Sequence, residues 1–246
     1  MGFAGGLIAT MLATIFKSLM GLEIEPAGYW SGDNKVFFAW LLYSISAILL
    51  ATGILSGIFI EKTTGKKEGI RKNLMGFIRI HGHSGRLLTD FYEIYKDSIY
   101  INMSVLCAFA TTLALALGTE LNGPVIAGIL TMTGFGGLGK HIRNVAPVVF
   151  GAVASAFINH QDPAAASNIL AILFSSGLAP ISGMFGGIWG FIAGFLHVNI
   201  ALYIGDLNAG LNLYNNGFAA SFVVMFLLPI ITIFKRDSYF KKDKYR

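Results

Sequence analysis

The residues in this sequence that could do chemistry are mainly glycine, histidine and asparagine. The stretch GFGGLGKH at 134–141 contains G-x-G-x-x-G, and it falls one residue short of a Walker A motif, because His141 stands where Ser or Thr would bind magnesium. Both nucleotide-binding motifs require a preceding strand in a soluble α/β unit. This stretch instead follows an apolar segment. We therefore expect no nucleotide site here.

Basic and amide side chains follow this motif directly and form one half of a candidate solute site, made of His141, Arg143 and Asn144. Such groups are suited to recognise an anionic or polar solute. The alternative is that basic residues anchor a helix end at a membrane interface.

The stretch HVNIALYIGDLNAGLNLYNNGF at 197–218 supplies the other half of the candidate site. Polar groups at membrane depth are costly and usually face a cavity or each other. Asn212, Asn215 and Asn216 share one face if this segment is helical. The alternative is a wet external loop with capping asparagines. The candidates from this half are His197, Asn199, Asn212 and Asn216.

The other polar residues indicate no catalytic centre. His81 and His83 form H-x-H, but no acidic partner stands at ligand spacing, so we interpret both as structural or solvated histidines. The five histidines form no HExxH zinc signature. No nucleophile has an evident paired base. We therefore expect no metal, no cofactor and no enzyme activity.

Composition identifies the surroundings in which these residues act. Of the 246 residues 54% are hydrophobic and only 13% are charged, against about 25% in ordinary soluble domains. A soluble chain of this length cannot hide so much apolar surface. The single cysteine, Cys107, excludes an intramolecular disulfide. The composition predicts a polytopic integral membrane protein.

Long apolar runs predict an all-α protein with six to eight helical segments, since backbone groups in lipid must bond within their own segment. The run 36–60 has no charge and is long enough to span a bilayer. Segments 123–139 and 164–182 are short enough to be re-entrant. The remaining segments are 2–20, 99–118, 145–159, 183–204 and 217–234.

Charge placement predicts the orientation in an inner (plasma) membrane. Residues 62–97 carry eight Lys/Arg against four Asp/Glu, and the tail 235–246 carries six against two. These clusters flank apolar runs, so the positive-inside rule explains them better than nucleic-acid binding does. Both termini are expected in the cytoplasm. The expected divisions are an N-terminal helix pair 1–61, a cytoplasmic loop 62–97, a membrane repeat domain 98–234 and a basic tail 235–246.

The basic loop also has helical periodicity. Apolar residues recur at helical spacing in its second half, with charged residues between them. The pattern fits a short helix lying on anionic lipid, or a gate or a partner-docking helix. The apolar residues are Leu87, Leu88, Phe91, Ile94 and Tyr95.

Two internal similarities predict repeats. Residues 2–16 align with 217–231. The positive-inside rule orients these two segments in opposite directions across the membrane, as in the inverted repeats of transporters. Pro124 and His141 match Pro180 and His197 at an offset of 56 residues. The alternatives are chance and the general richness of membrane helices in Gly and Pro. Glycines with an expected helix-packing role are Gly134, Gly136, Gly139, Gly186, Gly190 and Gly194.

The runs TDFYEIYKDSIYINM (89–103), LNGPVIAGILTMTGFGGLGKHIRN (121–144), GLAPISGMFGGIWGFIAGFLH (177–197) and GLNLYNNGFAASFV (210–223) resemble a domain-of-unknown-function family. Its members are bacterial integral membrane proteins, mostly from Firmicutes, with two tandem copies. By this resemblance the chain looks like the second copy plus the end of the first. The resemblance implies membrane location and repeats, and no activity.

These observations favour a channel or uncoupled transporter for a small polar solute, with its site between the two Gly-rich units. The alternative is a non-transport scaffold or accessory subunit. The expected partners are the lipid bilayer, a polar solute, and a further copy of the chain or repeat.

Overall fold

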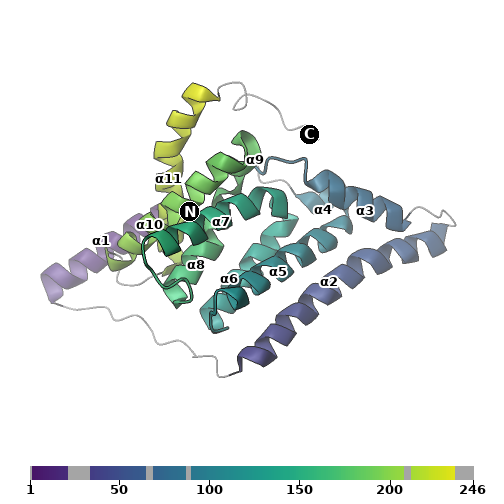
Figure 1. Ribbon diagram of the computed structural model, residues 1–246, viewed down its shortest axis with the longest axis horizontal. Coiled ribbons are helices and arrows are strands. Elements are labelled where there is room, and N and C mark those ends of the chain that lie inside the picture. The colour runs from purple at the N-terminus through teal and green to yellow at the C-terminus, as the bar shows by residue number, and fades with distance from the viewer. Residues whose placement is uncertain (1, 22–33, 65–68, 87–89, 208–211, 236–246) are drawn as a thin grey trace.

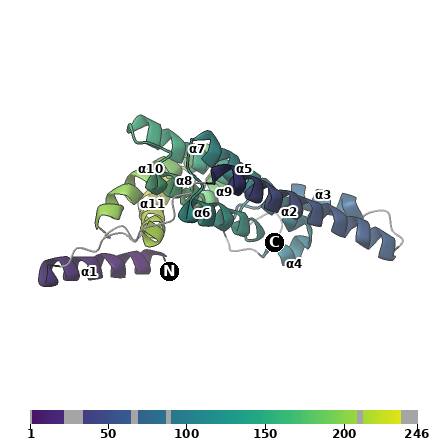
Figure 2. The same ribbon diagram turned by 90° about the horizontal axis from the view of Figure 1, so that it is seen from below.

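The computed structural model describes residues 2–21, 34–64, 69–86, 90–207 and 212–235, and these residues form helices and no strands. The all-α prediction is therefore confirmed (Figures 1 and 2). The helices are α1 (Gly2–Met20), α2 (Lys35–Thr64), α3 (Gly69–Ile80), α4 (Phe91–Tyr95), α5 (Ser98–Ala116), α6 (Gly123–Gly134), η1 (Phe135–Gly137), α7 (Ile142–Ile158), α8 (Ala166–Phe174), η2 (Ser175–Leu178), α9 (Ala179–Phe185), α10 (Gly187–Leu207) and α11 (Asn212–Phe234).

Five helical stretches are long and apolar enough to cross a membrane, which fits a membrane protein. Shorter apolar helices cover Ala4–Met20, Gly123–Gly137 and Ile142–Ile158. The number of crossings stays a prediction. The five stretches are Lys35–Thr63, Ser98–Ala116, Ala166–Phe185, Gly187–Ile204 and Asn215–Phe234.

Helices α2 and α5 lie side by side (Figure 1). The Ser46 hydroxyl donates to the Ser104 carbonyl oxygen at 2.9 Å. One face of α2 stays outside the packed bundle, with Trp40 and Phe59 largely exposed. Apolar side chains on an outer face are suited to contact lipid.

Helices α7 and α10 pack with their backbones close together. A Cβ at Gly151 would collide with the carbonyl oxygen of Phe191, and a Cβ at Gly194 would collide with that of Val148. Small residues on facing helix surfaces let two backbones come this close. The α7–α10 pair is therefore closely packed at the centre of the fold.

Helices α1 and α11, the two segments that are similar at an offset of 215 residues, pack against each other. A Cβ at Gly6 would lie 2.7 Å from the Cβ of Phe218. Beyond this contact α1 extends away from the rest of the bundle (Figure 2). The internal repeat itself stays a prediction.

Two of the apolar stretches are interrupted helices. Helix α6 tightens into η1 and then ends, and α7 begins only at Ile142. In the stretch Ala166–Phe185, η2 interrupts the path between α8 and α9, and Gly186 with φ of +102° separates α9 from α10. Pro124 and Pro180 lie in the first turns of α6 and α9, where a missing N–H costs nothing.

The basic loop holds its longer helix earlier than its periodicity predicts. Helix α3 occupies Gly69–Ile80, whereas α4 has only five residues. The Asp90 carboxylate accepts from the backbone N–H of Tyr92 at 2.9 Å, which begins α4 there. Lys96, with φ of +49°, ends it. Leu87 and Leu88 lie outside the described residues.

Candidate functional site

The interruption between η1 and α7 meets the segment that follows α3, and buried polar side chains gather where they touch. We call this cluster the histidine junction, and define it as His81, His83, Asn102, His141 and Asn144. Asn102 comes from the second turn of α5, and the other four come from the two non-helical connections and the start of α7. The cluster therefore joins segments that are far apart in the sequence.

His141 is the most buried histidine of the junction, with 1% of its surface exposed. Its Nε2 lies 2.9 Å from the carbonyl oxygen of His83. A carbonyl oxygen only accepts, so Nε2 carries the hydrogen and Nδ1 of the neutral ring keeps its lone pair. Within the described residues this Nδ1 is buried and has no hydrogen-bond partner. The His141 Nδ1 is thus a buried hydrogen-bond acceptor without a donor among the described residues.

Asn102 supplies a second buried acceptor without a donor among the described residues. Its Nδ2 donates to the carbonyl oxygens of Gly136 at 2.7 Å and Lys140 at 2.8 Å. These bonds use both amide hydrogens and satisfy carbonyls that the interrupted helix leaves free. The Asn102 Oδ1 is buried and has no partner in the part of the chain that the structure describes.

Asn144 shapes the turn that leads into α7. Its Oδ1 accepts from the backbone N–H of His141 at 3.0 Å, and its Nδ2 donates to the Gly139 carbonyl oxygen at 3.1 Å. Gly139 has φ of +90°, a conformation that favours glycine. Asn144 therefore holds His141 in place at the start of the helix.

The segment after α3 fits closely against this turn. Gly85 has φ of +74°, and a Cβ there would lie 2.7 Å from the Gly139 carbonyl oxygen. On the other side, a Cβ at Gly183 of α9 would collide with the Ser84 carbonyl oxygen. Two glycines thus let the segment lie between the turn and α9.

His81 and His83 also belong to the junction, which the sequence did not indicate. The His81 Nδ1 donates to the Phe77 carbonyl oxygen at 2.9 Å, and its ring centroid lies 5.0 Å from that of His141. The His83 Nε2 lies 2.7 Å from the Tyr95 hydroxyl. The only signal in the sequence was two histidines within the short Gly/Ser stretch 81–85.

The junction disfavours positive charge. Burial lowers the pKa of His141 to about 4, and His81, His83 and Arg143 add to this effect, against the hydrogen bond to His83. Burial also lowers the pKa of Lys140 to about 8, and its Nζ lies 3.9 Å from the Phe135 ring centroid. The described residues contain no group of three or more His, Cys, Asp or Glu side chains that could hold a metal ion.

The residues that the sequence singled out lie in three places. His141 and Asn144 lie in the junction, and Arg143 is exposed beside it. His197, near the middle of α10, is fully buried, and its Nε2 lies 3.2 Å from the Asn216 Oδ1 of α11. The His197 Nδ1 is also buried without a partner among the described residues.

The third place is the far end of α7. The Asn199 Nδ2 donates to the Ser155 hydroxyl at 2.7 Å, and the Asn159 Nδ2 donates to the Asn199 Oδ1 at 2.8 Å. A rise of 1.5 Å per residue places Asn144 and Ser155 about 16 Å apart along α7. The structure therefore does not bring Asn199 to His141. The side chain of Asn212 lies outside the described residues.

The glycines expected to pack helices differ among themselves. Gly190 packs against Ser182, Gly194 against Val148, and a Cβ at Gly136 would lie 3.1 Å from Leu106. Gly139 and Gly186 have positive φ, so their positions require glycine for backbone conformation. A Cβ at Gly134 would meet nothing within 4 Å.

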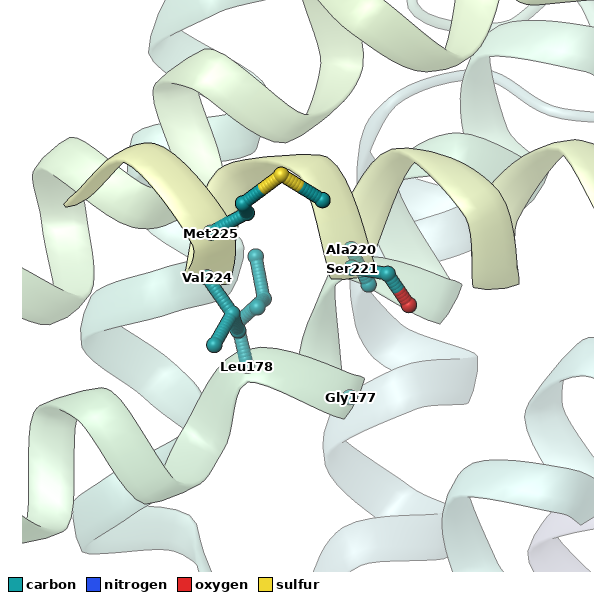
Figure 3. Close-up of a pocket in the computed structure, with 6 residues that line it drawn as sticks. All are labelled: Gly177, Leu178, Ala220, Ser221, Val224 and Met225. Atoms are coloured by element: carbon teal, nitrogen blue, oxygen red, sulfur yellow. The ribbon is translucent and has the colours of Figure 1, made fainter. Parts of the chain in front are cut away.

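A groove of about 410 Å³ lies between η2 and α11, apart from the junction (Figure 3). In Figure 3 the Leu178 and Val224 side chains project between the two helices, and the Ser221 hydroxyl points to the side of Gly177. Ser221 donates to the Gly217 carbonyl oxygen at 2.9 Å. Ala220, which lines the groove, lies one helical turn from Asn216.

Comparison with known proteins assigns a family and no activity. No curated protein matches the chain, and no solved structure matches it. The pattern of one family matches residues 70–233, a range that includes every residue of the histidine junction and the His197–Asn216 pair. The chain therefore belongs to the family described as "Protein of unknown function (DUF1576)".

Proposed function

We propose that the protein lets a small polar solute cross the membrane, as a channel or an uncoupled transporter, and that the solute contacts the histidine junction. One observation carries the proposal: Asn102 Oδ1 and His141 Nδ1 are two buried acceptors with no donor in the described part of the protein. Buried polar groups are normally hydrogen-bonded. Non-helical backbone at membrane depth is tolerated where it is enclosed in protein or lines a cavity.

The chemistry of these two acceptor atoms limits the class of solute that can bind them. Both atoms are acceptors, so a solute that binds them supplies N–H or O–H donors. Burial penalises a positive charge at His141, and the nearby Arg143 adds to this effect, so the junction disfavours a cation. The half-buried His81 ring lies against the His141 ring, so a solute that reaches His141 from this side would have to displace the His81 side chain. The proposed solute is therefore a small neutral hydrogen-bond donor.

Proteoliposomes that contain the full chain test the proposal with two labelled solutes of the same shape, urea and guanidinium. Urea is neutral and guanidinium is a cation, and both carry donors on a planar frame. We expect protein-dependent uptake of urea and none of guanidinium. No protein-dependent uptake of urea, acetamide or glycerol would overturn the proposed passage.

Variants test whether the junction is the site. We expect His141→Ala to lower uptake and His141→Gln to retain part of it, because glutamine keeps a donor and an acceptor. The matched control is His160→Ala, since His160 is exposed. His197→Ala tests the second buried histidine. Unchanged uptake in both His141→Ala and His197→Ala would exclude these sites.

A non-transport scaffold or accessory subunit is the second candidate, and the close glycine contacts of α7 and α10 favour it. A closely packed helix pair needs no solute path. This candidate predicts stable co-purification of one defined partner protein, with no uptake of any solute. Neither candidate function needs a nucleophile or a paired base.

The proposed setting is an inner membrane with both termini in the cytoplasm, in a protein that pairs with a further copy of the chain or repeat. Exposed apolar residues on α2 and α11 are compatible with contact to the lipid bilayer. A reporter fused at Lys67 tests the orientation, and its appearance on the outer face would overturn it.

A further inference from the structure

Helix α3 is held in one orientation by the face that it turns to the bundle. A Cβ at Gly69 would collide with the Gly57 carbonyl oxygen of α2. The Asn73 Nδ2 donates to the Gly53 carbonyl oxygen at 2.8 Å and to the Ser56 hydroxyl at 3.0 Å. The buried residues Gly69, Asn73, Gly76 and Ile80 recur at helical spacing. The residues on the opposite side of α3 therefore point away from the bundle.

The outward side of α3 combines apolar and basic residues. Leu74 is 45% exposed and Ile78 is 60% exposed. Arg71, Lys72 and Arg79 are exposed as well, and α3 contains no Asp or Glu. Lys72 and Arg79 are seven residues apart, so they lie on one flank of the helix, two turns from each other. A helix with this composition is suited to an interface with anionic lipid.

The place of α3 beside α2 fits the level of the lipid headgroups. Helix α2 has 30 residues, or about 45 Å at 1.5 Å per residue, against a hydrocarbon core of about 30 Å. Gly53 of α2 contacts Ile101 in the first turn of α5. The last turns of α2 therefore extend beyond the start of α5. The first half of α3 packs against this end of α2, and Gly76 in its second half packs against Ser98 at the start of α5 (Figure 2).

We propose that the outer face of α3, defined as Arg71, Lys72, Leu74, Ile78 and Arg79, binds the headgroups of anionic phospholipids. The cations contact the headgroup phosphate, and Leu74 and Ile78 enter the boundary of the acyl chains. A lipid fits better than a free phosphate because the exposed residues of α3 combine charge with apolar surface. This inference does not depend on solute passage.

Native mass spectrometry of the purified full chain tests the proposal with mixed phosphatidylglycerol and phosphatidylcholine micelles. The variant K72Q/R79Q removes both cations of one flank. The matched control K17Q/K235Q removes the same charge from exposed positions on α1 and at the end of α11. We expect phosphatidylglycerol affinity to fall about fivefold for each basic residue removed from α3. The control variant is expected to retain wild-type affinity.

A second measurement keeps the test valid if K72Q/R79Q folds poorly in detergent. A fluorophore is attached to the cysteine of Ile78→Cys on a Cys107→Ser background, which is otherwise free of cysteine. In liposomes, brominated phosphatidylglycerol is expected to quench it more strongly than brominated phosphatidylcholine at equal mole fraction. Equal quenching by the two lipids, or equal phosphatidylglycerol affinity of K72Q/R79Q and K17Q/K235Q, would overturn the proposal.

Discussion

His141 and His197 share one hydrogen-bonding state although they lie in different parts of the fold. In each ring Nε2 faces an oxygen, the His83 carbonyl at 2.9 Å and the Asn216 Oδ1 at 3.2 Å. In each ring Nδ1 is buried without a partner within the described ranges. The two histidines are the pair that matches at an offset of 56 residues. They differ in setting, because His141 precedes α7 whereas His197 lies inside α10.

The state of His141 predicts a loss of stability in mild acid. Its pKa in the folded protein is about 4, below the value of about 6.5 expected in the unfolded chain. The folded state therefore binds fewer protons, so this contribution is fully present above pH 6.5 and is lost as the pH falls towards 4. The contribution of His141 to the free energy of unfolding is at most about 3 kcal/mol.

Thermal unfolding between pH 7.5 and 4.5 measures this effect. We expect the melting temperature of the wild type to fall more steeply than that of His141→Gln, which has no titrating group at this position. His160→Gln is the control and is expected to follow the wild type. Parallel curves for the wild type and His141→Gln would show that burial of His141 does not set the pH dependence.

Removal of the Asn102 amide is predicted to destabilise the interruption before α7. Asn102→Leu leaves the Gly136 and Lys140 carbonyl oxygens without their donor, at a cost of about 1–3 kcal/mol for each buried group. Asn159→Leu is the control, because Asn159 is exposed and water can replace its bonds. Denaturation of both variants in one detergent checks the prediction, and a smaller loss in Asn102→Leu than in Asn159→Leu contradicts it.

Alanine at Gly194 is predicted to separate α7 from α10. The added Cβ would collide with the Val148 carbonyl oxygen, and backbone cannot move aside as a flexible side chain can. We expect Gly194→Ala to lower the free energy of unfolding by about 3 kcal/mol. At Gly134, where a Cβ meets nothing within 4 Å, alanine is expected to be neutral or slightly stabilising. Equal melting temperatures of the two variants would contradict the close packing.

The sequence predicted the helices better than their contacts. Apolar length alone was enough for α2, α5 and α10, because a helix in lipid satisfies its own backbone. It also singled out His141 and Asn144 as candidates for a solute site, which stays a prediction. Their neighbours could not be predicted, since His83 and His141 are 58 residues apart and meet through non-helical segments without periodicity.

The residues of α3 show why apolar periodicity did not predict this helix in the basic loop. Its inner face consists of glycine, asparagine and one isoleucine, and small or polar residues give no apolar stripe. Leu74 and Ile78, two of the apolar residues in its middle, are 45% and 60% exposed. The helix thus reverses the usual pattern of an amphipathic helix in a soluble protein. The short α4, by contrast, depends on the local cap by Asp90.

The close fit of Gly85 predicts that one methyl group can displace the segment after α3 from the histidine junction. In Gly85→Ala the residue has an unfavourable φ of +74°, and its Cβ would lie 2.7 Å from the Gly139 carbonyl oxygen. Ser84, now buried, would then become accessible. Labelling of Ser84→Cys by a membrane-impermeant maleimide, on a Cys107→Ser background, measures this directly. We expect slow labelling without Gly85→Ala and fast labelling with it. Gly177→Ala serves as the control, because a Cβ there meets nothing within 4 Å. If Gly85→Ala and Gly177→Ala give the same labelling rate, Gly85 does not hold the segment in place.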